Sequence, residues 1–278
     1  MEDSLKILTN AQLERYRQDG VVYPVPVLSL AEARSFLDRL DALETSEGAE
    51  VWKRVKMKPH LLVTAIADLA RHPRVLDAVE DIIGPDIMLW AVGRFSKPAG
   101  DPAFVSWHQD GTYWGLSEPA IVTAWVALTP STTESGCMRI MPGSHHEGQQ
   151  LHADRPDAAN MLSRGQEIAV EVDEAKAIDL VLQRGEISLH HPLAVHGSGP
   201  NRSGVRRVGI AIRYVAPQVC PAPGFADSAT LVRGEDRFGH FEQEPTPGRD
   251  FDPAAIDFYD RMVAAARDRK AAIAAQIG

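Results

Sequence analysis

The sequence predicts a mainly β protein, a sandwich or barrel of short strands with helices at both ends of the chain. Between residues 86 and 216, short runs rich in Val, Ile, Trp and Tyr are separated by Gly, Pro and Asp. This texture is typical of an all-β fold rather than of alternating strands and helices. Helix-capping patterns come before this region, and an Ala-rich segment follows it at 252–277. We therefore expect a β core flanked by helices.

Two capping boxes predict the first helices, Thr9 with Gln12 and Ser29 with Glu32, because each pair satisfies free backbone N–H groups. Gly20 is placed to end the first helix. The remaining elements of this part are an extended segment at 21–27 with two prolines, a helix from Ser29 to about Glu44, and helices at 61–70 and 73–83, the last closed by Gly84.

Seven strands follow, each bounded by turn residues. They are expected at 87–95, 104–109, 120–128, 138–141, 178–182, 186–190 and 205–215. The polar segment 149–168 reads as an irregular insertion near one mouth of the barrel. We expect a single domain over 1–278, with a mostly helical part (1–85), a β core (86–216) and an extension with a terminal helix (217–278).

Composition excludes several classes of protein. The 278 residues include 29 basic and 38 acidic side chains, a formal charge of −9, so the basic face of a nucleic-acid-binding protein is not expected. Two cysteines 83 positions apart do not predict a disulfide framework. The longest clean apolar run, 121–128, is far short of the ~20 residues of a membrane span, and the first ten residues do not resemble a signal peptide. We expect a cytoplasmic protein without membrane or nucleic-acid partners.

Histidine followed two positions later by an acid occurs four times, and ten histidines among 38 acids in 278 residues would produce about 1.4 such matches by chance, so context must choose among them. His152-Ala-Asp154 and His240-Phe-Glu242 are expected on solvated surface, and His145-His-Glu147 on a loop. Only His108-Gln-Asp110 follows a strand, which Gly111 would end.

Residues two apart on a strand share a face, so His108 and Asp110 would lie side by side. A second histidine from another strand would complete the facial triad of non-haem Fe(II) oxygenases. The candidates are His190, His191 and His196, and His196 stands where an apolar run meets a Gly/Pro/Asn turn. The residues alone also allow zinc, or ordinary half-buried histidines.

Four blocks in order resemble the phytanoyl-CoA dioxygenase family over roughly residues 10–216. They are Trp107-His-Gln-Asp-Gly-Thr-Tyr-Trp114, Thr123-Ala-Trp-Val-Ala-Leu128, Ser135-Gly-Cys-Met-Arg-Ile-Met-Pro-Gly-Ser-His145, and His196-Gly-Ser-Gly-Pro-Asn-Arg-Ser203 with Arg206-Arg207. The resemblance implies a double-stranded β-helix, a cupin-like jelly-roll barrel whose core is the segment 86–216. It also implies an Fe(II)- and 2-oxoglutarate-dependent dioxygenase in which His108, Asp110 and His196 bind iron.

The family also places an arginine eleven positions after the distal histidine, where it holds the distal carboxylate of 2-oxoglutarate. Arg207 stands there, with Arg206 as its rival; strand alternation allows only one of them to enter the barrel. By the same resemblance, Ser198 would donate its hydroxyl to 2-oxoglutarate and Trp125 would wall its pocket. A lysine of the 56–58 stretch, Lys56 or Lys58, reaches the co-substrate in some relatives, and no choice between them follows from the sequence.

The implied reaction uses O2 and decarboxylates 2-oxoglutarate to succinate and CO2 while a C–H bond of a small metabolite is hydroxylated. Related halogenases carry Ala or Gly where this chain has Asp110, so halogenation is disfavoured. Two alternatives stay open: a cupin-like metalloenzyme that does not use 2-oxoglutarate, and a non-catalytic barrel that serves as a binding module. Fold and iron site do not fix the substrate.

Aromatic and basic side chains near the triad are candidates for the substrate pocket, although core packing and surface ion pairs are their commoner roles. The aromatic candidates are Trp90, Phe95, Tyr113 and Trp114, and the basic ones are Arg139, Arg206 and Arg213. Gln109, on the other strand face by parity, is expected beside the metal ligands or on the substrate side. The oligomeric state does not follow from the sequence.

Overall fold

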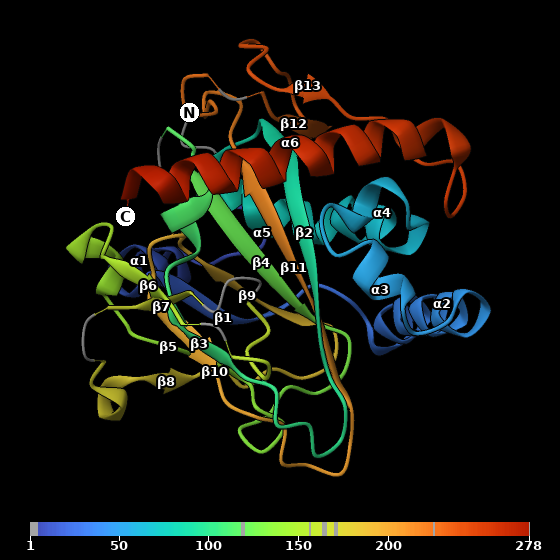
Figure 1. Ribbon diagram of the computed structural model, residues 1–278. Coiled ribbons are helices and arrows are strands. Elements are labelled where there is room, and N and C mark those ends of the chain that lie inside the picture. The colour runs from blue at the N-terminus through green and yellow to red at the C-terminus, as the bar shows by residue number, and fades with distance from the viewer. Residues whose placement is uncertain are drawn as a thin grey trace.

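The computed structural model describes residues 5–117, 120–155, 157–162, 166–169, 172–224 and 226–277. Within them, no helix combines the length and the apolar character needed to cross a bilayer. Figure 1 shows a β core with the long C-terminal helix lying along its upper end in that view and several helices gathered at one side.

The described residues form two main antiparallel sheets and a small hairpin. The larger sheet has the strand order β1 (Val21–Pro26), β9 (Glu186–His190), β4 (Ile121–Ala127), β11 (Arg207–Val215), β2 (Ile87–Lys97), β12 (Ser228–Arg233), β13 (Glu242–Gln243). The last pair, β12 and β13, is parallel. The smaller sheet has the order β3 (Val105–His108), β10 (His196–Ser198), β5 (Met138–Ile140), β8 (Ile178–Asp179). The hairpin pairs β6 (His152–Asp154) with β7 (Gln166–Ile168).

Helices cover the outer face of the larger sheet. They are α1 (Asn10–Asp19), α2 (Leu30–Glu47), α3 (Val51–Arg54), α4 (Thr64–Ala70), α5 (Pro73–Ile83) and α6 (Pro253–Ile277), with 3₁₀ turns η1 (Pro59–Leu61), η2 (Asp110–Tyr113), η3 (Ser144–Glu147) and η4 (Glu174–Lys176). Successive side chains of β11 point to opposite faces of the larger sheet. Ile210 and Ile212 pack in the core beneath the helices, whereas Ala211 packs in the core between the two sheets. The face that carries the odd-numbered residues of β11 therefore lines the interior of the barrel.

Most expected elements are confirmed. Both capping boxes form, Gly20 ends α1 in the left-handed conformation (φ 75°), and the helix 73–83 and the seven strands occur close to their expected positions. The mainly β, jelly-roll expectation is confirmed as well.

Three expectations about individual segments are wrong, and two elements, α3 and β12, were not expected. The helix expected from residue 61 begins only at Thr64, after the turn η1, and α3 was not expected. The strand expected to run to Gly111 ends at His108, so Asp110 opens η2 instead. The insertion 149–168 contains the hairpin β6–β7, and the extension after 216 adds β12 to the larger sheet. These strands are short or depend on distant partners, which local patterns do not report.

Candidate metal centre

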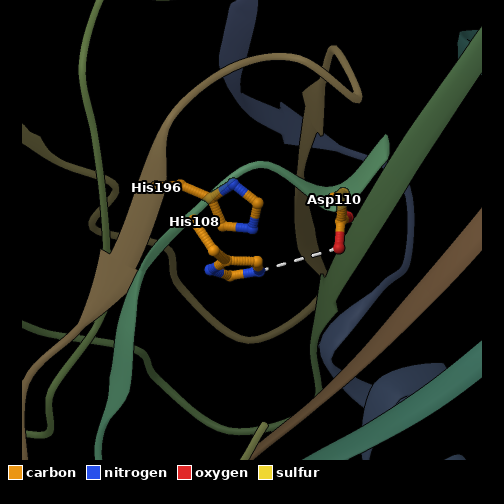
Figure 2. Close-up of side chains that lie close together, drawn as sticks. All are labelled: His108, Asp110 and His196. Atoms are coloured by element: carbon orange, nitrogen blue, oxygen red, sulfur yellow. Dashed lines mark ion pairs between the residues drawn. The ribbon is translucent and has the colours of Figure 1, made fainter. Parts of the chain in front are cut away.

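Three side chains converge between the two sheets: His108, Asp110 and His196 (Figure 2). Strands β3 and β10 pair so that His108 and His196 are directly opposite, and their ring centroids are 4.2 Å apart. Asp110 comes from η2, where the chain turns back toward the same point, and its Oδ1 lies 3.7 Å from His108 Nε2. One ligand atom from each residue lies within 4.8 Å of the others, and both histidines are buried.

Backbone carbonyls hold the two imidazoles in one orientation. His108 Nδ1 is 2.9 Å from the Ser106 carbonyl, and His196 Nδ1 is 2.9 Å from the Ala194 carbonyl. These contacts assign the proton of each ring to Nδ1 and leave the lone pair of Nε2 for a metal. Burial, followed by the nearby His108 and His190, lowers the pKa of His196 well below its usual value, so that its ring is neutral.

The carboxylate of Asp110 is kept ionised by its neighbours. Burial alone would raise its pKa, but Arg213, followed by the neighbouring His108 and His190, holds the pKa of Asp110 well below its usual value. Arg213 Nη2 lies 3.3 Å from Oδ1, and Thr123 Oγ1 lies 3.4 Å from Oδ2. Two imidazoles with Nε2 directed at one point and one carboxylate are the donor set of a divalent transition metal with open positions, so these residues fit iron.

His190 and His191, the other candidates for the third ligand, stand outside this group. His190 Nε2 lies 3.7 Å from Asp110 Oδ2, yet the metal-ligand geometry includes His196 instead. His191 lies beside His145, with ring centroids 5.0 Å apart, and Leu193 N donates to its Nδ1. Neither nitrogen of His190 has a hydrogen-bond partner among the described residues.

A cavity with an empty volume of about 420 Å³, part of it open to solvent, contains the triad. Arg207 lines this cavity and is 2% exposed, whereas Arg206 points out of the barrel and pairs with Asp41 on α2 at 2.5 Å. Burial lowers the pKa of Arg207 to about 10. Its guanidinium donates to the Gly136 carbonyl, while its Nε has no partner among the described residues. A buried guanidinium that forms no ion pair within the described chain fits an anionic ligand such as a carboxylate.

Trp125 and Ser198 line the same cavity. The Arg207 guanidinium lies 5.3 Å from the centre of the Trp125 ring. The indole crosses β11 at Gly209, where a Cβ would come within 2.0 Å of it, so only glycine leaves room for this position. Every predicted member of the co-substrate site thus lies on one cavity, except the lysine of residues 56–58.

That lysine points elsewhere. Lys58 is buried against β12, where its ammonium donates to the carbonyls of Trp90 and Ser228 and to Glu244, and Lys56 is exposed. Another lysine, Lys97, was not predicted to take part; it is fully buried and donates to Ser198 Oγ at 2.8 Å. Strand parity could have revealed it, because Lys97 lies two residues after Phe95, which lines the cavity.

Most of the substrate-pocket candidates have other roles. Trp90 and Trp114 pack on each other in the core at 5.0 Å, and the side chain of Tyr113 is outside the described part of the chain. Arg139 pairs with Glu174 and Asp179. Of the candidates whose side chains the structure describes, Phe95 and Arg213 line the cavity.

His152 was expected on solvated surface, and Gln109 was expected beside the metal ligands or on the substrate side. His152 is not a solvated surface residue: it is half-buried and its Nε2 accepts from the backbone of Gln109 at 2.9 Å. Gln109 is 1% exposed, and its amide donates to the carbonyls of Gly148 and Leu193. These bonds fasten the insertion to the segment between the ligands.

A jelly-roll barrel that gathers two histidines and an aspartate between its sheets defines the class of the non-haem metal oxygenases. The sequence profile of the phytanoyl-CoA dioxygenase family matches residues 16–209, and the chain belongs to this family.

Curated proteins and solved structures are similar to this chain over more than half of its length. A probable alpha-ketoglutarate-dependent hypophosphite dioxygenase of Stutzerimonas stutzeri is 29% identical over 185 residues, which is 65% of this chain and 63% of that protein. The chain covers less than two thirds of the length of this relative and of the next curated relatives. A solved structure of the non-heme monooxygenase ThoJ without ligand is 37% identical, with a TM-score of 0.84 over 95% of this chain and 99% of that one. CytC3 with Fe(II) and alpha-ketoglutarate, at 21% identity and a TM-score of 0.67 over 90% of this chain and 98% of that one, shows the same fold.

Proposed function

We propose that the protein is a non-haem Fe(II)- and 2-oxoglutarate-dependent dioxygenase that hydroxylates a C–H bond of a small metabolite. The observation that carries the proposal is the shared cavity: a His-Asp-His triad and a buried arginine without a carboxylate partner in the described chain lie on one hollow. A metal with open positions and an anionic co-substrate are the two ligands that such a site would accept.

In this proposal, Nε2 of His108, Nε2 of His196 and the carboxylate of Asp110 hold the iron. Arg207 and Ser198 hold the distal carboxylate of 2-oxoglutarate, and Trp125 closes the wall beside them. Iron, 2-oxoglutarate and O2 together supply the oxidation, in which one oxygen atom enters the substrate and the other enters succinate as CO2 leaves. Arg213 and Thr123 keep Asp110 ionised and oriented.

The proposed substrate is small. The cavity that contains the triad must hold both the co-substrate and the reacting part of the substrate. Asp110 fills the position that halide would need on iron, which favours oxygen insertion over halogenation. We also propose that the whole chain acts as one domain, since β1, β2 and β12, from its three parts, share a sheet.

The test is succinate formation by the purified protein with Fe(II), 2-oxoglutarate and ¹⁸O₂, alone and with a panel of small metabolites. The proposal expects iron-dependent succinate carrying one labelled oxygen, and its loss below detection in Asp110→Ala. Iron binding is measured in parallel on His196→Gln, which should lose it, and on His190→Gln, which lines the same cavity and should keep it. Oxygen consumption without succinate would contradict the proposal and favour a cupin-type metalloenzyme that uses no 2-oxoglutarate.

A further inference from the structure

A second cation stands beside Arg207 inside the barrel. Lys97 and Arg207 are directly opposite each other in the pairing of β2 with β11, and their side chains therefore leave the sheet on the same face. Lys97 is fully buried and Arg207 is 2% exposed. Like charges at directly opposite positions destabilise a sheet, and burial makes this worse.

The described part of the chain does not neutralise this pair. No described carboxylate lies within ion-pair distance of Lys97 or Arg207. Asp101 lies near enough to favour the charged form of Lys97, but its Oδ1 accepts from the backbone of Ala103. Cys137, the other neighbour of both cations, stays protonated because burial raises the pKa of its thiol to about 11.

The contacts of Lys97 point toward the cavity through Ser198. The ammonium donates to Ser198 Oγ at 2.8 Å and to the carbonyl of Gly199. An ammonium only donates, so Ser198 Oγ acts as acceptor in this bond and its own proton remains to be donated to another group. Ser198 lines the cavity beside Arg207, so that proton is available to a ligand there.

We infer that Lys97 is a specificity-determining residue for the co-substrate: it orients the hydroxyl of Ser198 and adds a second positive charge for the distal carboxylate, thereby selecting 2-oxoglutarate over 2-oxo acids that lack this carboxylate. The inference rests on the proposed function. Lys97 acts through Ser198 and through its charge and does not line the cavity, so it is a positioning residue.

The inference also predicts how affinity changes with pH. Burial, followed by the neighbouring Arg207, lowers the pKa of Lys97 to about 7. A bound carboxylate favours the ammonium and raises this pKa, so affinity is highest below pH 7 and falls as the pH rises above it. The groups that face Lys97 are Arg207, Asp101, Cys137 and Ser198, and the lowered pKa of Arg207 (about 10) and the raised pKa of the Cys137 thiol (about 11) both lie above the range from pH 7 to 9.

The experiment compares two ligands by anaerobic titration of the Fe(II)-loaded protein, with the visible charge-transfer band as readout. 2-Oxoglutarate carries the distal carboxylate, whereas 2-oxopentanoate has the same chain length without it. Lys97→Met is expected to weaken 2-oxoglutarate binding by roughly 10- to 100-fold, because the Ser198 hydroxyl is no longer oriented toward the distal carboxylate and a nearby positive charge is removed. Binding of 2-oxopentanoate should change by less than about 3-fold, because this ligand has no distal carboxylate.

Arg206→Gln is the matched control, since it removes a cation from the same strand but on the outer face, and both ligands should bind it as they bind the wild type. Two further variants keep the test decisive if Lys97→Met does not fold. Ser198→Ala should weaken 2-oxoglutarate selectively, and Lys97→Arg should keep the affinity while abolishing its fall between pH 7 and 9.

Equal weakening of both ligands by Lys97→Met would overturn the inference, because it would mark Lys97 as purely structural. Unchanged affinity for both ligands would overturn it too. If the wild-type protein gives no band with either ligand, the proposed function itself fails, and that result is distinguishable from the other two.

Discussion

Two groups of buried charged side chains among the described residues differ in how completely their charges are paired. The first, the Glu244 cluster, comprises Lys58, His60, Ser228, Thr230 and Glu244. Both carboxylate oxygens of Glu244 are used: Oε1 accepts from Lys58 and Ser228, and Oε2 accepts from Thr230 and lies 2.9 Å from His60 Nε2. The cluster fastens the C-terminal extension to the turn η1, and its charges satisfy each other.

The second group consists of Lys97 and Arg207, which we call the cavity cations. They are as deeply buried as the Glu244 cluster, but neither has a carboxylate partner in the part of the chain described here. Burying a charge without a partner costs several kcal/mol, so such a group either shifts its pKa toward the neutral form or is compensated by a charge from outside the chain. The contrast is between a self-paired network, the Glu244 cluster, that stabilises the fold and a pair of cations that fits the anion-binding role proposed above.

The largest expected effect comes from breaking the Glu244 cluster. Lys58→Met leaves the carboxylate of Glu244 buried without its ammonium, which should lower the free energy of unfolding by about 3–5 kcal/mol. Chemical denaturation measures this, with exposed Lys56→Met as the control that should change it by less than about 0.5 kcal/mol. The double variant with Glu244→Met should recover part of the loss. A double variant as unstable as the sum of the single ones would show that the two charges do not interact.

The cavity cations should respond in the opposite way. Arg207→Met removes a buried charge that has no carboxylate partner in the described chain, so the melting temperature should stay within about 3 °C of the wild type. Affinity for 2-oxoglutarate should fall by roughly 30- to 100-fold, about 2–3 kcal/mol for a charged hydrogen-bonded partner. Arg206→Met is the matched control for affinity. If Arg206→Met lost the affinity instead, the strand register of this account would be wrong by one residue.

A smaller effect is expected from displacing the Trp125 indole, which lies beside Arg207 in the cavity. Gly209→Ala places a methyl group where the Trp125 indole lies, which should cost about 1–3 kcal/mol of stability, as overpacking does. Because the indole must then move against Arg207, 2-oxoglutarate affinity should fall as well. Gly204→Ala, where a Cβ meets nothing within 4 Å, is the control. An unchanged affinity in Gly209→Ala would show that the position of Trp125 does not matter for the co-substrate.

The last prediction concerns how the free energy of unfolding falls at acidic pH. Burial alone would raise the pKa of Glu244, but Lys58 and then His60 hold it well below its usual value. Folding therefore favours the ionised carboxylate. Its contribution is complete above the unfolded pKa of about 4.3 and is lost as the pH falls through the folded value. Denaturation curves from pH 7 to 2 should show a steeper loss in the wild type than in Glu244→Gln, and equal slopes would contradict this assignment.

The sequence predicted the centre of the site better than its surroundings. Ordered motif blocks identified the triad, and strand parity correctly sent Arg206 and Arg207 to opposite faces of β11. These predictions depend on local spacing, which a single sequence contains. Strand parity also predicted that Asp110 lies on the same strand as His108. This prediction is wrong, because β3 ends at His108 and Asp110 opens η2.

What the sequence could not predict depends on long-range partners. Lys58 was considered for the co-substrate, yet its partners Ser228 and Glu244 lie 170 and 186 positions away and hold it on β12. Lys97 was overlooked because its meaning arises only from pairing opposite Arg207 across two strands. Burial of a charge without a partner is a property of the folded chain, and no local pattern reports it.

The most direct test of this account is an anaerobic titration of the purified protein with Fe(II) and then with 2-oxoglutarate, followed by visible absorption. The account predicts a weak charge-transfer band that grows with 2-oxoglutarate, saturates at one equivalent per chain and disappears when oxygen is admitted. Iron binding without a band would contradict the assignment of the cavity cations to 2-oxoglutarate, and failure to bind iron would contradict the triad.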